Sequence, residues 1–178
     1  MPRRTLVTGG VRSGKSAYAE SLVADAADVL YVAPGPAPDP DADAEWAARV
    51  AAHQLRRPAT WTTAETADIA DAVGNARGPV LVDCLGTWVT AVVDELRGWD
   101  RPRDKWADEF DERLDAFIEA WAKTTYDVVA VTNEVGWGVI PEHHSGRLFR
   151  DLLGRVNQQV ATASDDVVLV VAGRTITL

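Results

Sequence analysis

Near the start of the chain, eight consecutive residues fit the pattern G-x-x-x-x-G-K-[ST]: Gly9, Gly10, Val11, Arg12, Ser13, Gly14, Lys15 and Ser16. Glycines let the backbone wrap so that amide N–H groups point at phosphate oxygens, and a helix starting near Lys15 adds its positive end. Lys15 would then reach the β and γ phosphates as a catalytic group, and Ser16 would ligate Mg²⁺. Because a strand is expected before this P-loop and a helix after it, a phosphate site is favoured over an incidental glycine turn.

A second candidate is the carboxylate of Asp83, which follows the apolar run of residues 80–82. In parallel sheets the ligand crevice lies beyond the carboxyl ends of the strands. We therefore expect Asp83 to hold Mg²⁺ together with Ser16 and to lie beside the nucleotide; the alternative is that it only caps the next helix. Glu134 ends another strand at the same edge, where either a metal or substrate contact or a structural hydrogen bond would explain it.

Histidine chemistry centres on His53, which lies in a predicted helix and is followed by Arg56 and Arg57. A neutral imidazole is a competent covalent nucleophile. Attack on the α-phosphorus of a nucleoside triphosphate would give a phosphoramidate that a second phosphate can displace, and the arginines could neutralise phosphate charge. A lone helical histidine is more often a surface or packing residue, so these residues alone do not assign catalysis.

Two further groups leave alternatives open. His143 and His144 follow Glu142, and this segment is either a metal site or, as we favour, a solvated loop. Trp137 lies between two glycines, where it either packs or lines a substrate site.

The elements that position these residues alternate between short apolar strands and amphipathic helices. Strands are expected at 5–8, 28–33, 60–63, 80–83, 127–132, 167–171 and 174–178, and helices at 15–26, 45–55, 66–75, 87–96, 105–123 and 145–164. A loop rich in proline and aspartate is expected at 34–43. The alternation predicts an α/β, P-loop NTPase-like three-layer fold, with a mostly parallel β-sheet flanked by helices, in one domain of residues 1–178.

Composition excludes several classes of protein. A net charge of −9 argues against a surface that coats nucleic acid. No apolar run approaches the roughly 20 residues that span a bilayer, and the start of the chain does not read as a signal peptide. The single cysteine, Cys84, allows no internal disulfide, which suits the cytoplasm.

Several segments, in order, resemble the family of bifunctional adenosylcobinamide kinases / adenosylcobinamide-phosphate guanylyltransferases. The P-loop with Thr8 before it is similar to the start of that family, and residues 45–53 followed by 56–58 resemble its guanylylation segment. Residues 132–141 and 147–158 resemble two highly characteristic segments. The resemblance covers most of the chain and is much more specific than the P-loop.

This resemblance implies two reactions. ATP or GTP first phosphorylates the aminopropanol hydroxyl of adenosylcobinamide; GMP from GTP then joins the new phosphate through a GMP–histidine intermediate, giving adenosylcobinamide-GDP and pyrophosphate. It places the catalytic histidine at His53, and it implies a homotrimer and these corrinoids as partners. Beyond the P-loop, the nucleotide-contacting residues it implies are Val32, Ala33, Pro34, Gln54, Leu55, Arg56, Arg57 and Glu65.

Two competing functions remain at the level of sequence. The first is a P-loop kinase for another small alcohol, without guanylyl transfer. The second is a non-enzymatic nucleotide switch, against which the absence of an Asn-Lys-x-Asp guanine-reading motif argues. Covalent labelling of His53 would separate the transferase from both.

Overall fold

The computed structural model describes residues 1–37 and 39–178, so position 38 of the expected loop lies outside the described residues. The strands are β1 (Arg4–Gly9), β2 (Leu30–Ala33), β3 (Thr62–Glu65), β4 (Val80–Asp83), β5 (Val128–Val131), β6 (Asp166–Val171) and β7 (Arg174–Thr177). The helices are α1 (Lys15–Leu22), α2 (Ala44–Arg56), α3 (Ile69–Gly74), α4 (Leu85–Glu95), α5 (Ala107–Lys123) and α6 (His144–Thr162), with a 3-10 turn η1 (Arg103–Lys105).

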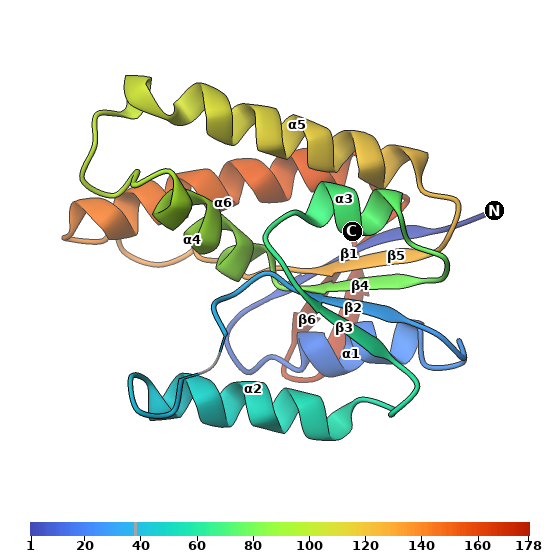
Figure 1. Ribbon diagram of the computed structural model, residues 1–178. Coiled ribbons are helices and arrows are strands. Elements are labelled where there is room, and N and C mark those ends of the chain that lie inside the picture. The colour runs from blue at the N-terminus through green and yellow to red at the C-terminus, as the bar shows by residue number, and fades with distance from the viewer. Residues whose placement is uncertain (38) are drawn as a thin grey trace.

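The strands form one sheet in the order β3-β2-β4-β5-β1-β6-β7. Every neighbouring pair is parallel except β6 and β7, which form an antiparallel hairpin at one edge. Helices α3, α4, α5 and α6 cover one face, whereas α1 and α2 lie on the other (Figure 1). The three-layer α/β fold with a mostly parallel sheet is therefore confirmed.

The inner strands β2, β4 and β5 are largely apolar because both of their faces are covered, whereas the edge strands β3 and β7 are polar and mostly exposed. Along β4, Val80 and Val82 join the apolar cluster beneath α3–α6, and Leu81 between them joins the cluster on the α1 side. This follows the two-residue period of a strand. The cluster beneath α3–α6 is the larger of the two and contains most of the buried aromatic side chains.

Local capping shifts several element boundaries from those expected. Helix α1 stops at Leu22 rather than at 26, because the chain turns where the Val23 N–H donates to the Glu20 carbonyl. Helix α4 begins two residues early because the Thr87 hydroxyl accepts a hydrogen bond from the Cys84 N–H.

Strand β3 runs over Thr62–Glu65 rather than 60–63. This register places Glu65 opposite Ala33 at the carboxyl ends of two parallel strands.

Among the described residues, each helix is too short or too polar to cross a bilayer.

Candidate active site

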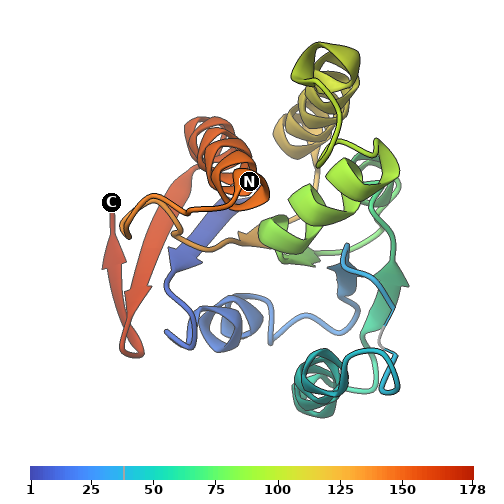
Figure 2. The ribbon, with the colours of Figure 1, turned by 90° about the vertical axis from the view of Figure 1, so that its left-hand side faces the viewer.

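The site lies at the edge of the sheet where the parallel strands end, and Figure 2 looks onto this edge. A cavity of about 590 Å³ opens there between the P-loop, the strand ends and α2. Many residues expected from the sequence line it: Val11, Arg12, Ser13, Gly14, Lys15, Ser16, Ala33, His53, Arg56, Arg57, Glu65 and Asp83. The fold therefore brings together residues more than 70 positions apart in the chain.

The P-loop wraps tightly between β1 and α1. A Cβ atom at Gly9 would lie 2.5 Å from the Val170 carbonyl oxygen, and Gly14, just before α1, has φ of 95°. Glycine is thus required at the first position by close packing and at the second by a left-handed backbone. The N-terminus of α1 consequently opens onto the cavity, the arrangement that binds anions.

Lys15 begins α1, and its Nζ atom donates to the Gly10 carbonyl oxygen at 3.2 Å. Burial lowers the pKa of Lys15, although the charges of Cys84 and Asp83 oppose that shift. A lysine in this position is a partly desolvated cation, which a triphosphate would pair more strongly than a fully hydrated one.

Asp83 stands at the centre of a hydrogen-bonded group. His53 Nδ1 lies 3.4 Å from Asp83 Oδ2, and the Tyr31 hydroxyl donates to the same oxygen at 3.0 Å. The side chain of Asp83 is only 9% exposed, against 32% for His53. The N-cap of α4 is Cys84, so the alternative that Asp83 only caps that helix is wrong.

The ionisation states in this group follow from their surroundings. Burial tends to raise the pKa of Asp83, but hydrogen bonds with His53, Ser16 and Tyr31 outweigh it, so that pKa lies below its usual range. Burial, followed by the charge of Asp83, raises the pKa of Tyr31, which keeps its hydroxyl protonated as a donor. An ionised Asp83 and the Ser16 hydroxyl are the hard oxygen donors that suit Mg²⁺.

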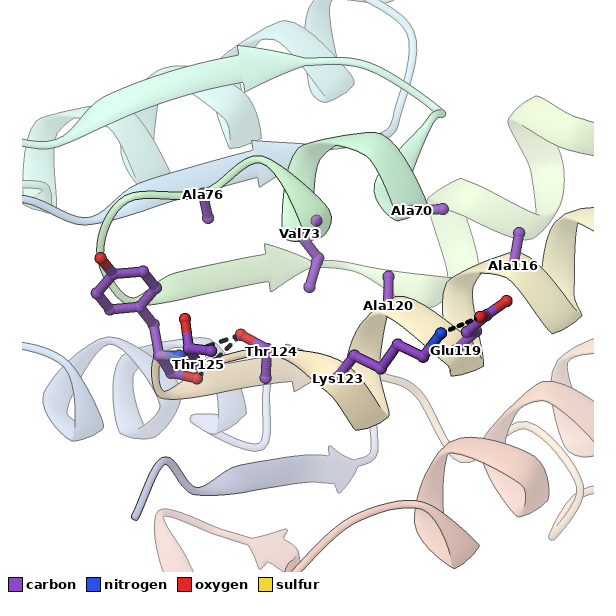
Figure 3. Close-up of a pocket in the computed structure, with 11 residues that line it drawn as sticks. Ala70, Val73, Ala76, Ala116, Glu119, Ala120, Lys123, Thr124 and Thr125 are labelled. Carbon is purple, nitrogen blue, oxygen red and sulfur yellow. Dashed lines mark hydrogen bonds and ion pairs between the residues drawn. The ribbon is translucent and has the colours of Figure 1, made fainter.

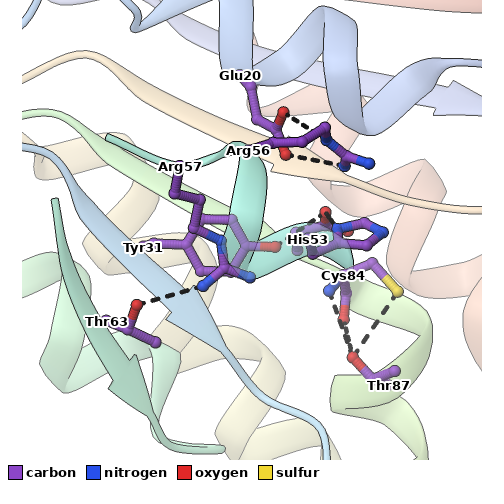
Figure 4. Close-up of polar contacts among 9 residues, drawn as sticks. Glu20, Tyr31, His53, Arg56, Arg57, Thr63, Cys84 and Thr87 are labelled. Carbon is purple, nitrogen blue, oxygen red and sulfur yellow. Dashed lines mark hydrogen bonds and ion pairs between the residues drawn. The ribbon is translucent and has the colours of Figure 1, made fainter. Parts of the chain in front are cut away.

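The two arginines that follow His53 already have partners (Figure 4). Arg56 donates from Nε and Nη2 to the carboxylate of Glu20 at 3.2 and 3.1 Å. The guanidinium of Arg57 lies 3.3 Å from the centroid of the Tyr31 ring, and its Nη1 donates to Thr63. That either arginine contacts phosphate stays a prediction, since both line the cavity but each already has a protein partner.

Other expected contact residues are not among those that line the cavity. Val32 is fully buried in the apolar core beneath α3–α6. Pro34 is buried, while Gln54 and Leu55 face solvent, with Leu55 87% exposed. Gly9 and Gly10 belong to the P-loop but do not line the cavity. That these six residues contact the nucleotide therefore remains a prediction, which the lining of the cavity does not support.

The cavity also contains residues to which sequence reasoning gave no role: Tyr31, Gly35, Pro36, Trp46, Val50, Cys84, Thr87 and Asn133. At Gly35 a Cβ atom would lie 3.1 Å from the Trp46 ring, so the missing side chain lets that ring close over the strand ends. Burial and the nearby Asp83 charge raise the pKa of the Cys84 thiol. Strand periodicity could have assigned Tyr31 to the α1 face, but not its contact with Asp83.

The structure bears on two questions that the sequence left open, namely the role of Glu134 and that of the segment 142–144. The Thr8 hydroxyl donates to Glu134 Oε1 at 2.9 Å, which fixes Glu134 against β1. Within the described part of the chain, no three His, Cys, Asp or Glu side chains are grouped as a metal site. Glu142, His143 and His144 are exposed, but the expected loop ends earlier, because His143 is the N-cap of α6 and His144 begins that helix.

A second cavity, of about 400 Å³, lies between α3 and α5 (Figure 3). Small apolar side chains of α3 and α5 and the polar segment 124–126 line it together with the ion pair of Glu119 and Lys123. It shares no residue with the P-loop cavity, so the chemistry-bearing side chains gather in the first cavity.

Comparison with known proteins gives consistent matches. A family model described as cobinamide kinase / cobinamide phosphate guanyltransferase matches residues 5–178. The chain is 42% and 41% identical to the bifunctional adenosylcobalamin biosynthesis proteins CobU of Salmonella typhimurium and Escherichia coli, covering 94% of this chain and 95% of each relative. It is 34% identical to CobP of Pseudomonas aeruginosa, covering 96% of this chain and 94% of that protein.

Among solved structures, the chain resembles an ATPase from a bacterial type III secretion system with a TM-score of 0.56. The likeness covers 94% of this chain and 50% of that chain at 12% sequence identity. It therefore concerns the P-loop fold alone.

Proposed function

The chain belongs to the cobinamide kinase / cobinamide phosphate guanyltransferase family, and we propose that its P-loop cavity carries out both reactions. In the first, the γ-phosphoryl group of ATP or GTP passes to the aminopropanol hydroxyl of adenosylcobinamide. In the second, GMP from GTP joins that phosphate, giving adenosylcobinamide-GDP and pyrophosphate. The observation that carries the proposal is the placement of His53 and the P-loop in one cavity.

For the kinase reaction, the P-loop amides and Lys15 would bind the β and γ phosphates. The oxygens of Ser16 and Asp83 would hold Mg²⁺, which supplies positive charge against the charge that develops on the phosphates. The fit rests on the ionised carboxylate and its hydrogen bond with Ser16. Mg²⁺ typically takes only one or two carboxylates and fills its remaining positions with phosphate oxygens and water.

For guanylyl transfer, Asp83 holds Nδ1 of His53 and so leaves Nε2 as the attacking nitrogen. Nε2 forms a bond to the α-phosphorus of GTP while the bond to the bridging oxygen breaks and pyrophosphate leaves. An oxygen of adenosylcobinamide phosphate then attacks the same phosphorus and releases His53. Asp83 stabilises the cationic ring that exists between the two displacements.

The test is incubation of the protein with Mg²⁺ and GTP that carries a radiolabel in its α-phosphate. The native protein should become covalently labelled, and His53→Ala should not. His143→Ala, which alters an exposed histidine outside the cavity, is the matched control and should label like the native protein. No label on the native protein, or equal label on His53→Ala, would leave only a kinase.

The assembly and location are also part of the proposal. We propose a homotrimer, supported by exposed apolar side chains at Trp137, Val139 and Ile140 that a subunit contact could cover. We place the enzyme in the cytoplasm, where its nucleotide substrates are available and where its one free thiol, Cys84, stays reduced. Sedimentation equilibrium would test the trimer, with a monomer mass as the contrary result.

A further inference from the structure

Helix α2 carries His53 but buries no side chain that the structure describes within it. Near its carboxyl end, the helix instead contacts the rest of the protein through hydrogen bonds, an ion pair and a cation–π contact. His53 meets Asp83, Arg56 meets Glu20, and Arg57, the residue after the helix, lies over Tyr31 (Figure 4). Because apolar burial does not fix this end of the helix, these contacts decide where the imidazole lies.

Arg56 and Glu20 form a bidentate ion pair, called the tie below because it joins α2 to α1. Two guanidinium nitrogens meet the two carboxylate oxygens at 3.2 and 3.1 Å, the paired arrangement that gives arginine its directional strength. The Glu20 side chain is 13% exposed and that of Arg56 is 43% exposed. The pair is thus partly shielded from water on the side of Glu20.

The tie connects the two helices that hold the reacting groups. Glu20 lies on α1, the helix that begins with Lys15 at the P-loop. Arg56 follows His53 by three residues, which places both on one side of α2 within a single turn. A fixed Arg56 therefore limits both the rotation of α2 and its distance from bound phosphates.

We propose that Glu20 is a positioning residue for guanylyl transfer: through Arg56 it holds His53 in line with the α-phosphorus of the bound nucleotide. This inference rests on the proposed function and deepens it. It contrasts with a direct phosphate contact by Arg56. In that case Glu20 would compete with the phosphates for the guanidinium, and its removal would leave the transfer unchanged or faster.

The experiment measures the single-turnover rate of His53 labelling at saturating GTP and, separately, the rate of adenosylcobinamide phosphorylation. In Glu20→Gln, labelling should fall about 10- to 100-fold, the range expected for misplacement of a reacting group by about 1 Å. Phosphorylation should change less than about threefold, because the P-loop is intact. Glu119→Gln, which removes an exposed carboxylate paired on α5, is the matched control and should match the native protein in both rates.

Double substitution gives an independent readout. Arg56→Gln should slow labelling as much as Glu20→Gln, and the double variant should be no slower than either, since one interaction is lost in all three. Glu20→Asp should recover part of the labelling rate. Melting followed by circular dichroism should show all variants folded at the assay temperature.

Native or faster labelling in Glu20→Gln would overturn the inference in favour of a phosphate-binding Arg56. Equal loss of labelling and phosphorylation would also overturn it, because the pair would then support the whole site. Absence of label on the native protein would instead contradict the proposed function, and this inference with it.

Discussion

The two faces of the sheet are built differently. Beneath α3–α6, tilted and edge-to-face contacts join the rings of Phe110, Trp88, Phe117 and Trp121 in that order, with neighbouring ring centroids 5.7 to 5.9 Å apart. On the other face the smaller cluster receives buried Ala19 and half-buried Tyr18 from α1 and Val23 just after it, and α2 buries none of its described side chains. The residues proposed for chemistry lie at the carboxyl edge, under this thinner layer.

Helices α5 and α2 are attached to the sheet in different ways. Both are amphipathic, yet α5 buries Phe110, Leu114, Phe117 and Trp121, whereas α2 is held by charged and polar contacts. Apolar burial stabilises a helix in proportion to the area removed from water, whereas a paired arginine and carboxylate also fix the direction of their contact. We infer that the layer of α3–α6, the thick layer, provides stability. The layer of α1 and α2, the thin layer, provides alignment of the reacting groups.

The largest effect that would test this comparison is on stability. Phe117→Ala removes a ring that is 1% exposed and packed against Trp88 and Trp121. We expect the free energy of unfolding to fall by about 3–5 kcal/mol, because a cavity replaces the ring. Urea denaturation would measure this change, provided that the slope of the unfolding free energy against urea concentration is the same in both proteins. A decrease in the free energy of unfolding below about 1 kcal/mol would contradict a stability role for the thick layer.

The next effect concerns rate rather than stability. Lys15→Ala should slow both reactions about 10²- to 10³-fold, or about 2.7–4 kcal/mol in activation free energy, the range for loss of one charge-stabilising donor. The free energy of unfolding should change little because Lys15 lies at the cavity edge. Steady-state kinetics of each reaction would show it, and a native rate in either would exclude Lys15 from that reaction.

A smaller effect is the pH dependence of the kinase reaction. Burial lowers the pKa of Lys15, and only its protonated form carries the charge that pairs with phosphate. Activity should therefore decline as pH rises through that lowered pKa, earlier than for an ordinary lysine near about 10.4. The measurement is kcat/KM against pH; Lys15→Arg should lack this decline in whatever activity it keeps, and an identical profile would contradict the assignment.

The smallest effect is expected on the outer side of α2. Leu55 is 87% exposed and does not line the cavity. Leu55→Ala should change the free energy of unfolding by less than about 0.5 kcal/mol, as surface substitutions usually do. Calorimetry would measure it. A loss comparable to that of Phe117→Ala would show that α2 is packed in the way α5 is.

Features set by neighbouring residues could be predicted from the sequence. The P-loop, the short apolar strands and Asp83 at a strand end all depend on local patterns, and the structure places them in one cavity. His53 is different, because a single histidine has no periodic signal. Its assignment needed the family resemblance.

Contacts between distant segments could not be predicted in the same way. Tyr31 and Asp83 are 52 residues apart, and Glu20 and Arg56 are 36 apart. These pairs depend on strand order and on how α2 lies against α1, which no local pattern specifies. The partners of the two arginines therefore came only from the structure.

We propose that one cavity performs both reactions and that His53 serves only the second. The most direct measurement supplies adenosylcobinamide, GTP and Mg²⁺ to the native protein and to His53→Ala, and follows both corrinoid products by chromatography. We predict that the native protein forms the phosphate and then adenosylcobinamide-GDP, whereas His53→Ala accumulates the phosphate. Formation of adenosylcobinamide-GDP by His53→Ala at the native rate would contradict the account.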